Sequence, residues 1–281
     1  MHIFGIDYTT ISRTLTALVN HLTDTFTPLL TDNLEFFVTR FPLYRQSILN
    51  AHAANGNAPP FGLDDVVGFV DATMNFINRP EGGLQRAVFS GKSKRHCLKS
   101  QSNKFKYLII SQCLVLLQRL GVNFPDGMIG ISTLPVGGAQ HDMRIFRESN
   151  INNLFREAQL GNALQGIMFG DKAYSAAWTH ARGLFKGANL EQWQVLSNNI
   201  MSPVRTGAEW PFGLMNQKCK FLSFSQSRKL QESAVGKFYL VGVFIANTNT
   251  CLNGGGTVLA YFNCPPPTLA QYFHCPEAVG Y

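Results

Sequence analysis

The chain has 281 residues, of which 45% are hydrophobic, so it is long enough to bury one large core. It carries 24 Lys and Arg against 17 Asp and Glu, and this formal net charge of +7 favours nucleic acid as a partner over a membrane surface. The six cysteines form no C-x-x-C pair, which disfavours both a disulfide-rich secreted scaffold and a usual zinc site.

No segment has the pattern of a membrane span or a secretory signal. The most apolar stretch, YLIISQCLVLLQRLGV, is shorter than the roughly 20 residues that a spanning helix needs, and Ser111, Gln112 and Arg119 interrupt it. The first residues, MHIFGIDYTTISRTL, lack a basic start and a continuous apolar core. We therefore expect a soluble protein without a membrane partner.

Residues 1–60 are predicted to form a helical N-terminal region. Thr9 or Thr10 can cap a first helix, and apolar residues recur at helical spacing after them. Two interpretations remain open for this helix: an ordinary packing helix, or part of a truncated helix-turn-helix with the Ser12 and Arg13 end facing DNA. The loop AANGNAPPFG then marks a boundary before a second region, residues 61–281.

From residue 61 onward, predicted strands alternate with helices. We expect strands over 66–73, 128–134 and 164–170, with a hairpin within 86–101 that turns at Ser90 and Gly91 beside the first strand. We expect helices over 141–154, 190–200, 208–222 and 236–250. This order predicts an α/β fold in which a ribonuclease H-like mixed sheet is flanked by helices.

Three acidic residues stand where such a fold would gather them. Asp71 ends the apolar run in VVGFVDAT, and Asp171 ends the run in LQGIMFGDKAY. An apolar run that ends in Asp places a carboxylate at the carboxyl edge of an α/β sheet. Glu209, in VRTGAEWPFG, stands at a predicted helix start. Because such carboxylates are costly unless they bind a cation, they predict a cage for a pair of divalent metals, which suits phosphodiester chemistry.

These phrases occur in the order found in the DDE superfamily, and the chain resembles its Harbinger-type transposases and the endonucleases derived from them. The matching phrases, over about residues 61 to 275, are VDAT, FSGKSKRHCLKSQ, PDGMIGISTLPVGGAQHDMRIFRES, GDKAY, VRTGAEWPFG and GKFYLVGVFIANTNTCLNGG. The resemblance implies that Asp71, Asp171 and Glu209 are the catalytic, metal-binding triad. It also implies two Mg²⁺ or Mn²⁺ ions as cofactors and DNA as the substrate.

Asp142 is the rival, or a helper, for the second carboxylate. Asp171 is preferred because it ends a predicted strand, whereas Asp142 follows two glycines at a helix start, where Asp commonly caps free backbone N–H groups. The third ligand depends on Pro211, which is tolerated only in a first helical turn. The helix that carries Glu209 must therefore begin at about Ala208 or later, which could tilt the carboxylate away from the metals.

The chain also departs from the family pattern. Ala72 replaces the family's Gly after the first Asp, and Met74 replaces its His. Residues 102–124 have no counterpart in the pattern. Two interpretations stay open for them: an inserted surface helix, or a segment foreign to the working fold.

Basic residues cluster around the predicted site and are candidates for DNA-phosphate contacts, which bind without reading sequence. These candidates are Lys92, Lys94, Arg95, Lys99, Arg205, Lys218 and Lys220. The alternative is a solvated basic surface and, for Arg205, a structural salt bridge.

The resemblance implies a nuclear, metal-dependent DNA endonuclease or transposase that could form a homo-oligomer and work with a Myb-like helper protein. The alternative is a catalytically inactive, transposon-derived DNA-binding or regulatory protein. A third hypothesis, a decayed copy without function, rests on the unmatched residues 102–124.

Overall fold

The fold is described from a computed structural model. The residues that the structure describes are 5–31, 33–58, 63–74, 78–79, 85–86, 89–91, 93–96, 118–132, 146, 151–160, 165–175, 180–207, 209–222 and 235–274.

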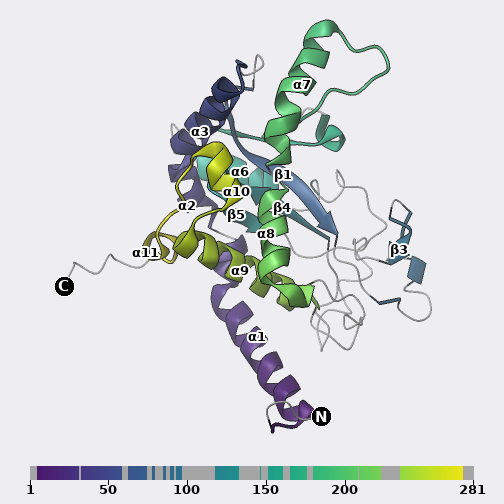
Figure 1. The fold of residues 1–281 in the computed structure, drawn as a ribbon, viewed down its shortest axis with the longest axis vertical. Helices are drawn as coiled ribbons and strands as arrows, with labels where there is room; N and C mark the ends of the chain where they lie inside the picture. The colour runs from purple at the N-terminus through teal and green to yellow at the C-terminus, as the bar shows by residue number, and fades with distance from the viewer. Residues whose placement is uncertain are drawn as a thin grey trace, which may run out of the picture.

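A mixed sheet of five strands lies at the centre of the molecule (Figure 1), in the order β5-β4-β1-β6-β7. Its strands are β1 (Val66–Met74), β4 (Gln118–Asn123), β5 (Ile129–Ser132), β6 (Ile167–Gly170) and β7 (Ala181–Gly183). The central strand β1 pairs antiparallel with β4 and parallel with β6. β5 continues the antiparallel side and β7 the parallel side. The prediction of a mixed α/β sheet flanked by helices is confirmed.

Strand β4 corrects the interpretation of residues 102–124 as an inserted helix or a foreign segment. Residues 118–123 pair with β1 at six successive positions, from Phe69↔Asn123 to Met74↔Gln118. They pair with β5 on their other side, so β4 is an interior strand of the sheet. For residues 118–123 the interpretation was wrong, because no turn residue separates this strand from the apolar run before it. Residues 102–117 lie outside the described residues.

The predicted hairpin is present but not where we expected it. β2 (Phe89–Ser90) and β3 (Arg95–His96) pair antiparallel around a turn that begins at Gly91. They form a separate two-stranded sheet, and the place beside β1 belongs to β4. The prediction that this hairpin supplies the neighbour of the first strand is therefore wrong.

The remaining elements are helical. The three N-terminal helices are α1 (Tyr8–Thr31), α2 (Leu34–Thr39) and α3 (Phe41–Ala54). The helices and 3₁₀ turns after the sheet begins are α6 (Ile151–Gln159), η2 (Lys172–Ser175), α7 (Gln192–Thr206), α8 (Trp210–Lys218), η3 (Lys220–Leu222), α9 (Val235–Asn253), α10 (Thr257–Phe262) and α11 (Leu269–Tyr272). The helices predicted over 190–200, 208–222 and 236–250 are confirmed. The one predicted over 141–154 overlaps α6 only at its end, since most of residues 141–150 lie outside the described part.

The N-terminal helices are confirmed, although the cap of the first is not a threonine. Asp7 precedes α1, and its Oδ1 accepts hydrogen bonds from the backbone N–H of Thr9 at 2.7 Å and of Thr10 at 3.4 Å. These bonds lower the pKa of the Asp7 carboxyl, the largest cause being the hydroxyl of Thr10. The prediction of a Thr9 or Thr10 cap is wrong because the carboxylate reaches both free N–H groups.

Helices α2 and α3 share their core with the sheet. The ring of Phe124, just after β4, stacks on Phe37 of α2 at 4.7 Å and on Tyr44 of α3 at 4.8 Å between ring centroids. Cβ atoms built at Gly68 and Gly130 would lie 2.9 and 2.2 Å from this ring, so the two strands need glycine there to make room for it. The boundary near residue 60 stays a prediction, while the core crosses it.

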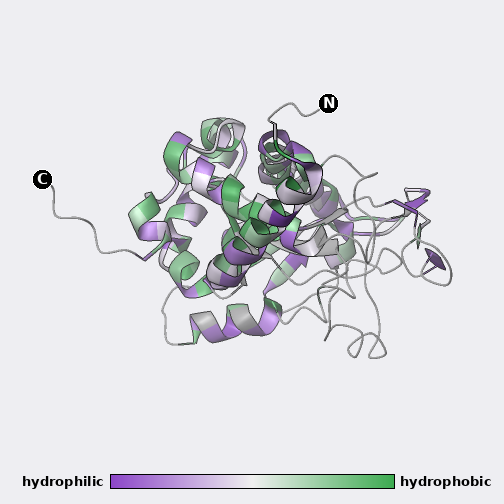
Figure 2. Cartoon of the chain, turned by 90° about the horizontal axis from the view of Figure 1, so that it is seen from below, coloured by the Kyte–Doolittle hydropathy of each residue, from purple (hydrophilic) through white to green (hydrophobic). Residues whose placement is uncertain are grey.

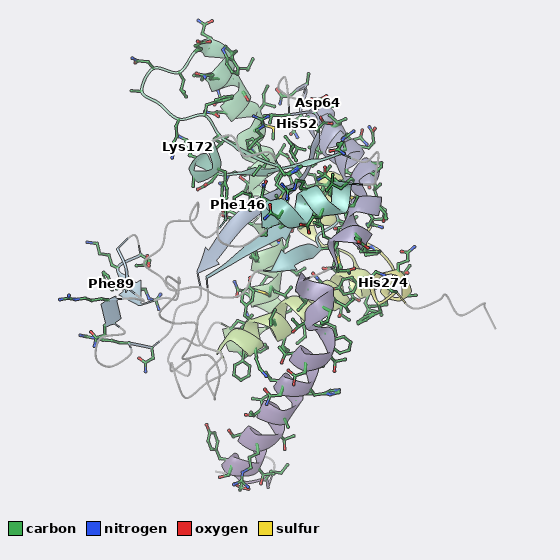
Figure 3. The ribbon with its side chains drawn as sticks, turned by 180° about the vertical axis from the view of Figure 1, so that it is seen from behind. His52, Asp64, Phe89, Phe146, Lys172 and His274 are labelled. Atoms are coloured by element: carbon green, nitrogen blue, oxygen red, sulfur yellow. The ribbon has the colours of Figure 1, made fainter. Side chains whose placement is uncertain are left out.

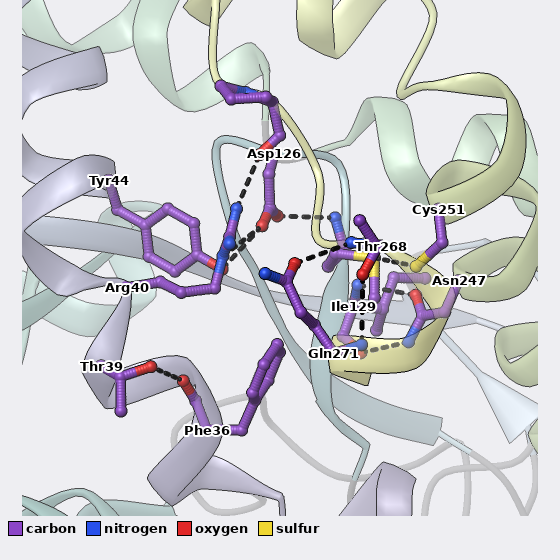
Figure 4. A network of polar contacts seen from close by, with 12 residues as sticks. Phe36, Thr39, Arg40, Tyr44, Asp126, Ile129, Asn247, Cys251, Thr268 and Gln271 are labelled. Atoms are coloured by element: carbon purple, nitrogen blue, oxygen red, sulfur yellow. Dashed lines mark hydrogen bonds and ion pairs between the residues drawn. The ribbon is translucent and has the colours of Figure 1, made fainter. Parts of the chain in front are cut away.

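A buried polar network joins α3 to the turn between β4 and β5 (Figure 4). Oδ2 of Asp126, a residue with no exposed surface, accepts a 2.7 Å hydrogen bond from the Tyr44 hydroxyl and lies 3.3 Å from Nε of Arg40. Its Oδ1 accepts from the backbone N–H of Met128 at 3.0 Å. Burial raises the pKa of the Asp126 carboxyl, and Arg40 with these hydrogen bonds opposes the shift.

The edge strand β5 is covered by helix α9. Asn247 of α9 accepts a hydrogen bond from the backbone N–H of Ile129 and donates one to its carbonyl, both at 2.9 Å. The side-chain amide thus bonds the edge of β5 as the backbone of a further strand would, which protects that edge from pairing with another chain.

Candidate active site

Asp71 lies within β1, and Asp171 directly follows β6, the parallel neighbour of β1. Phe69 of β1 is the register partner of Phe169 of β6, and the same register continued by two residues aligns Asp71 with Asp171. Adjacent strands lie about 4.8 Å apart, so this register sets the backbones of the two aspartates at neighbouring positions. Both residues are half-buried. The two aspartates that the sequence singled out thus follow register partners of adjacent strands, and their joint role as metal ligands stays a prediction.

The residues around Asp171 fix its orientation. Oδ1 of Asp171 accepts a 2.7 Å hydrogen bond from the backbone N–H of Ala173, and its carbonyl accepts one from Tyr174 at 3.0 Å. Tyr174 is buried against Phe146, with 5.7 Å between ring centroids. A Cβ at Gly170 would lie 2.4 Å from the Tyr174 ring, so the glycine makes room for it. Within the phrase GDKAY, Gly170 and Tyr174 thus pack together and the backbone holds Asp171 in one orientation.

Glu209 lies at the start of a helix, as Pro211 required. It is the N-cap of α8, which begins at Trp210 with the proline in its first turn. Its Oε1 lies 3.2 Å from Nη2 of Arg205, in the last turn of α7, and 53% of the Glu209 side chain is exposed. The structure thus gives Glu209 a cationic partner and leaves it accessible.

Packing brings the turn that carries Glu209 to the face of the sheet where Asp71 is expected. A Cβ at Gly207 would lie 2.7 Å from the ring of Phe262 in α10, so glycine lets this turn rest on that ring. The ring of Phe262 lies 5.7 Å from that of Phe69 in β1. Since residues two apart on a strand share a face, Asp71 follows Phe69 on the side that α10 and this turn cover.

The donor chemistry at the sheet edge suits a hard cation, because Mg²⁺ and Mn²⁺ prefer carboxylate oxygens. Among the described residues, however, no group of three His, Cys, Asp or Glu side chains is close enough together to hold one metal ion. Asp71 and Asp171 are neighbours, whereas Glu209 is paired with Arg205. Asp142 lies outside the described residues, so its choice as rival or helper stays a prediction.

Comparison with known proteins identifies the family. The family model described as DDE superfamily endonuclease matches residues 70–247, which is more than half of the chain. The chain belongs to the DDE superfamily of endonucleases. Asp71, Asp142, Asp171 and Glu209 all fall inside the matched range. No curated protein and no solved structure gave a match.

Family membership makes this chain a transposase-like nuclease domain, for which DNA is the implied substrate. Divalent metals are typical of the family. Within the described residues, none of the helices combines the length and the apolar character that crossing a membrane requires.

The basic candidates of this DDE endonuclease fall into two places. Lys94 and Arg95 are exposed on the β2–β3 hairpin, which lies on the side of the molecule toward which β1 points (Figure 1) and is mostly hydrophilic (Figure 2). Phe89 marks this hairpin in Figure 3, where Lys172, next to Asp171, lies on the same side of the molecule. Lys92 and Lys99 lie outside the described residues.

Lys218 and Lys220 are exposed at the far end of α8. Nine residues separate Lys218 from Glu209, which is about 13 Å along a helix. They therefore lie away from Glu209, whereas Arg205 lies beside it; contact of these residues with DNA phosphates stays a prediction.

The sequence did not reveal the glycines that make room for aromatic rings beside the site, or the buried aspartate that stabilises the fold. Gly170 and Gly207 are needed because an aromatic ring occupies the space of their side chains, and the only signal was that each glycine lies next to or near a predicted carboxylate. No local pattern marks Asp126 as a buried residue, because its partners Arg40 and Tyr44 lie more than 80 positions away. Asp126 is not part of the site, since it follows β4 at the end of the sheet where β1 begins.

Proposed function

We propose that this chain is a metal-dependent DNA endonuclease of the transposase type, in which Asp71, Asp171 and Glu209 hold two Mg²⁺ or Mn²⁺ ions. The observation that supports the proposal is the parallel register of β1 and β6, in which Phe69 pairs with Phe169 two residues before Asp71 and Asp171, inside the range of the family match. When bound, such ions activate a water or a DNA 3′-hydroxyl and stabilise the departing oxygen of a phosphodiester.

The chain's own residues would prepare this chemistry. The backbone N–H of Ala173 holds Oδ1 of Asp171, while Oδ2 has no hydrogen-bond partner within the described residues and is available to a cation. Asp71 would join it from the adjacent strand, and Glu209 from the turn that packs on Phe262. Lys94 and Arg95 would bind the DNA backbone on the side toward which β1 points.

Strand order and motif order support finer assignments. Three antiparallel strands followed by two parallel ones, with β1 in the middle, favour a ribonuclease H-like sheet. The phrases GDKAY and VRTGAEWPFG favour the Harbinger type. With DNA as the substrate we also propose a nuclear location, a Myb-like helper protein and a homo-oligomer.

Nicking of supercoiled plasmid tests the main proposal. With Mn²⁺ or Mg²⁺ the purified chain should convert plasmid to open circles, and Asp71→Asn and Asp171→Asn should each abolish this activity. Asp64→Asn is the matched control, since Asp64 is an exposed acid that precedes β1 at its other end. Cutting that persists in both site variants would refute the assignment of the carboxylates.

A second candidate, a catalytically inactive DNA-binding or regulatory protein, is favoured by the pairing of Glu209 with Arg205 and by the lack of a three-carboxylate group among the described residues. It predicts DNA binding that weakens with salt and no cutting with any divalent ion. Under this alternative, Asp71→Asn and Asp171→Asn leave DNA affinity unchanged or raise it, because they remove negative charge.

A further inference from the structure

In the described part of the chain, the Glu209 side chain pairs with Arg205, four residues earlier. The two residues lie on either side of the break between α7 and α8, and Nη2 of Arg205 donates a 3.2 Å hydrogen bond to Oε1 of Glu209. Backbone hydrogen bonds hold the turn between them, from Gly207 to Val204 and from Glu209 to Thr206, both at 3.1 Å. The turn therefore holds the two side chains close enough to form the ion pair.

We propose that Arg205 and a divalent cation are alternative partners of Glu209, so that Arg205 lowers the affinity of the site for metal until the pair opens. This inference rests on the proposed function. It assigns Arg205 as a positioning residue that acts through Glu209, in addition to any contact that its guanidinium makes with DNA.

Two physical reasons support competition. A carboxylate oxygen that accepts a hydrogen bond from a guanidinium cannot offer the same lone pair to a metal, and the fixed positive charge of Arg205 repels a second cation placed beside Glu209. The side chains are 21% and 53% exposed, and ion pairs this exposed are weak. A divalent ion can therefore displace Arg205 from Glu209, but breaking the ion pair should lower the affinity of the site for that ion.

The buried side of Arg205 indicates why the guanidinium stays near Glu209. Its Nε is buried and has no hydrogen-bond partner within the described residues. An unpaired buried N–H is costly, and the hydrogen bond from Nη2 to Glu209 offsets part of this cost. Arg205 therefore holds the carboxylate until a stronger cation replaces it.

Binding of Mn²⁺ to the full chain without DNA tests the inference, with the free ion measured by electron paramagnetic resonance. Arg205→Ala should tighten Mn²⁺ binding by about two- to five-fold, the range expected from an exposed ion pair. Lys237→Ala is the matched control, because Lys237 is 20% exposed and pairs with Asp24 at 3.5 Å, away from the site. It should leave Mn²⁺ affinity unchanged.

A Glu209→Gln background isolates the competition from a general change in charge. There the gain from Arg205→Ala should vanish, since the two effects act through one carboxylate. Mn²⁺ binding that Asp71→Asn abolishes but that Arg205→Ala leaves unchanged or weakens would overturn this inference alone. Absence of Mn²⁺ binding in both the native chain and Arg205→Ala would overturn it together with the proposed function.

Discussion

Phe69 and Phe169 are register partners on adjacent parallel strands, and each is followed two residues later by an aspartate. Both rings are buried, with 1% of each exposed, so they fix the register of β1 against β6 from within the core. The alignment of Asp71 with Asp171 thus depends on hydrophobic packing as well as on backbone pairing. Changes that disturb this packing should disturb the site without touching either carboxylate.

Gly170→Ala should destabilise the fold and weaken metal binding together. The new Cβ would lie 2.4 Å from the ring of Tyr174 and 2.9 Å from Val70. The ring must therefore move, and with it the Tyr174 backbone N–H that bonds the carbonyl of Asp171. Overpacking of this kind costs about 1–3 kcal/mol, which urea denaturation measures as a lower midpoint. Gly91→Ala is the control, since nothing lies within 4 Å of its Cβ position. Equal urea midpoints for the two variants would contradict the conclusion that Gly170 is needed to make room for the Tyr174 ring.

Gly207→Ala should act through Glu209. Its Cβ would lie 2.7 Å from the ring of Phe262, so the turn between α7 and α8 must lift away from β1. We expect plasmid nicking to fall more than stability does, because the shift moves a carboxylate relative to Asp71 while most of the core stays packed. Nicking rates measured at a temperature where circular dichroism shows the variant folded would separate the two effects.

Gly213→Ala is the matched control for this change, because Gly213 is an exposed helical position in α8 with nothing within 4 Å of its Cβ. It should stabilise the helix by up to about 1 kcal/mol and leave nicking intact. Loss of nicking in Gly213→Ala would show that α8 responds to any substitution, and the packing argument for Gly207 would fail.

The sequence was sufficient for the strands that carry the carboxylates. Both strands contain a short apolar run that leads to an Asp, so their existence could be predicted, although β1 continues past Asp71 to Met74. β4 could not, because Gln118–Asn123 follows the apolar run LIISQCLVLL without a turn signal to mark its start. The hairpin was therefore predicted as the neighbour of β1, because its turn residues are clear. In the structure its two strands pair with each other.

Side-chain partners were predictable only where they are close in sequence. The pair of Arg205 with Glu209 is four residues apart, and a salt bridge there was one of the predicted alternatives. The partners of Asp126 lie 82 and 86 positions away, and nothing in the phrase PDG distinguishes a buried, ion-paired aspartate from one in an exposed turn. Long-range polar contacts depend on the packing of whole elements, which periodicity does not give.

Asp126→Ala should be among the most damaging single changes in the fold. It would leave the Tyr44 hydroxyl, Arg40 and the N–H of Met128 without their shared acceptor in the core. Breaking a buried ion pair in this way costs about 3–5 kcal/mol, measurable as a large fall in the urea midpoint. Asp65→Ala provides the comparison, because Asp65 is 55% exposed and pairs with Arg45 at 2.8 Å. Its cost should stay within about 1 kcal/mol.

Two buried histidines predict that stability falls in mild acid. His52 is 1% exposed and His180 is 9% exposed, and burial lowers the pKa of both imidazoles from 6.5, with Arg156 adding to the effect on His180. Below pH 6.5 these two imidazoles bind protons in the unfolded chain but stay neutral in the folded chain. The stability present above pH 6.5 is therefore lost as the pH falls toward the lowered values, at no more than about 1.4 kcal/mol per pH unit for each histidine.

Urea midpoints measured from pH 7.5 to pH 5 test this dependence. His52→Gln and His180→Gln should each flatten the loss of stability toward low pH, because the group that must gain a proton on unfolding is gone. His21→Gln is the control, since His21 is exposed on α1 and should leave the slope as it is. If neither buried histidine changes the slope, the acid sensitivity belongs to other groups and the burial of these imidazoles does not govern it.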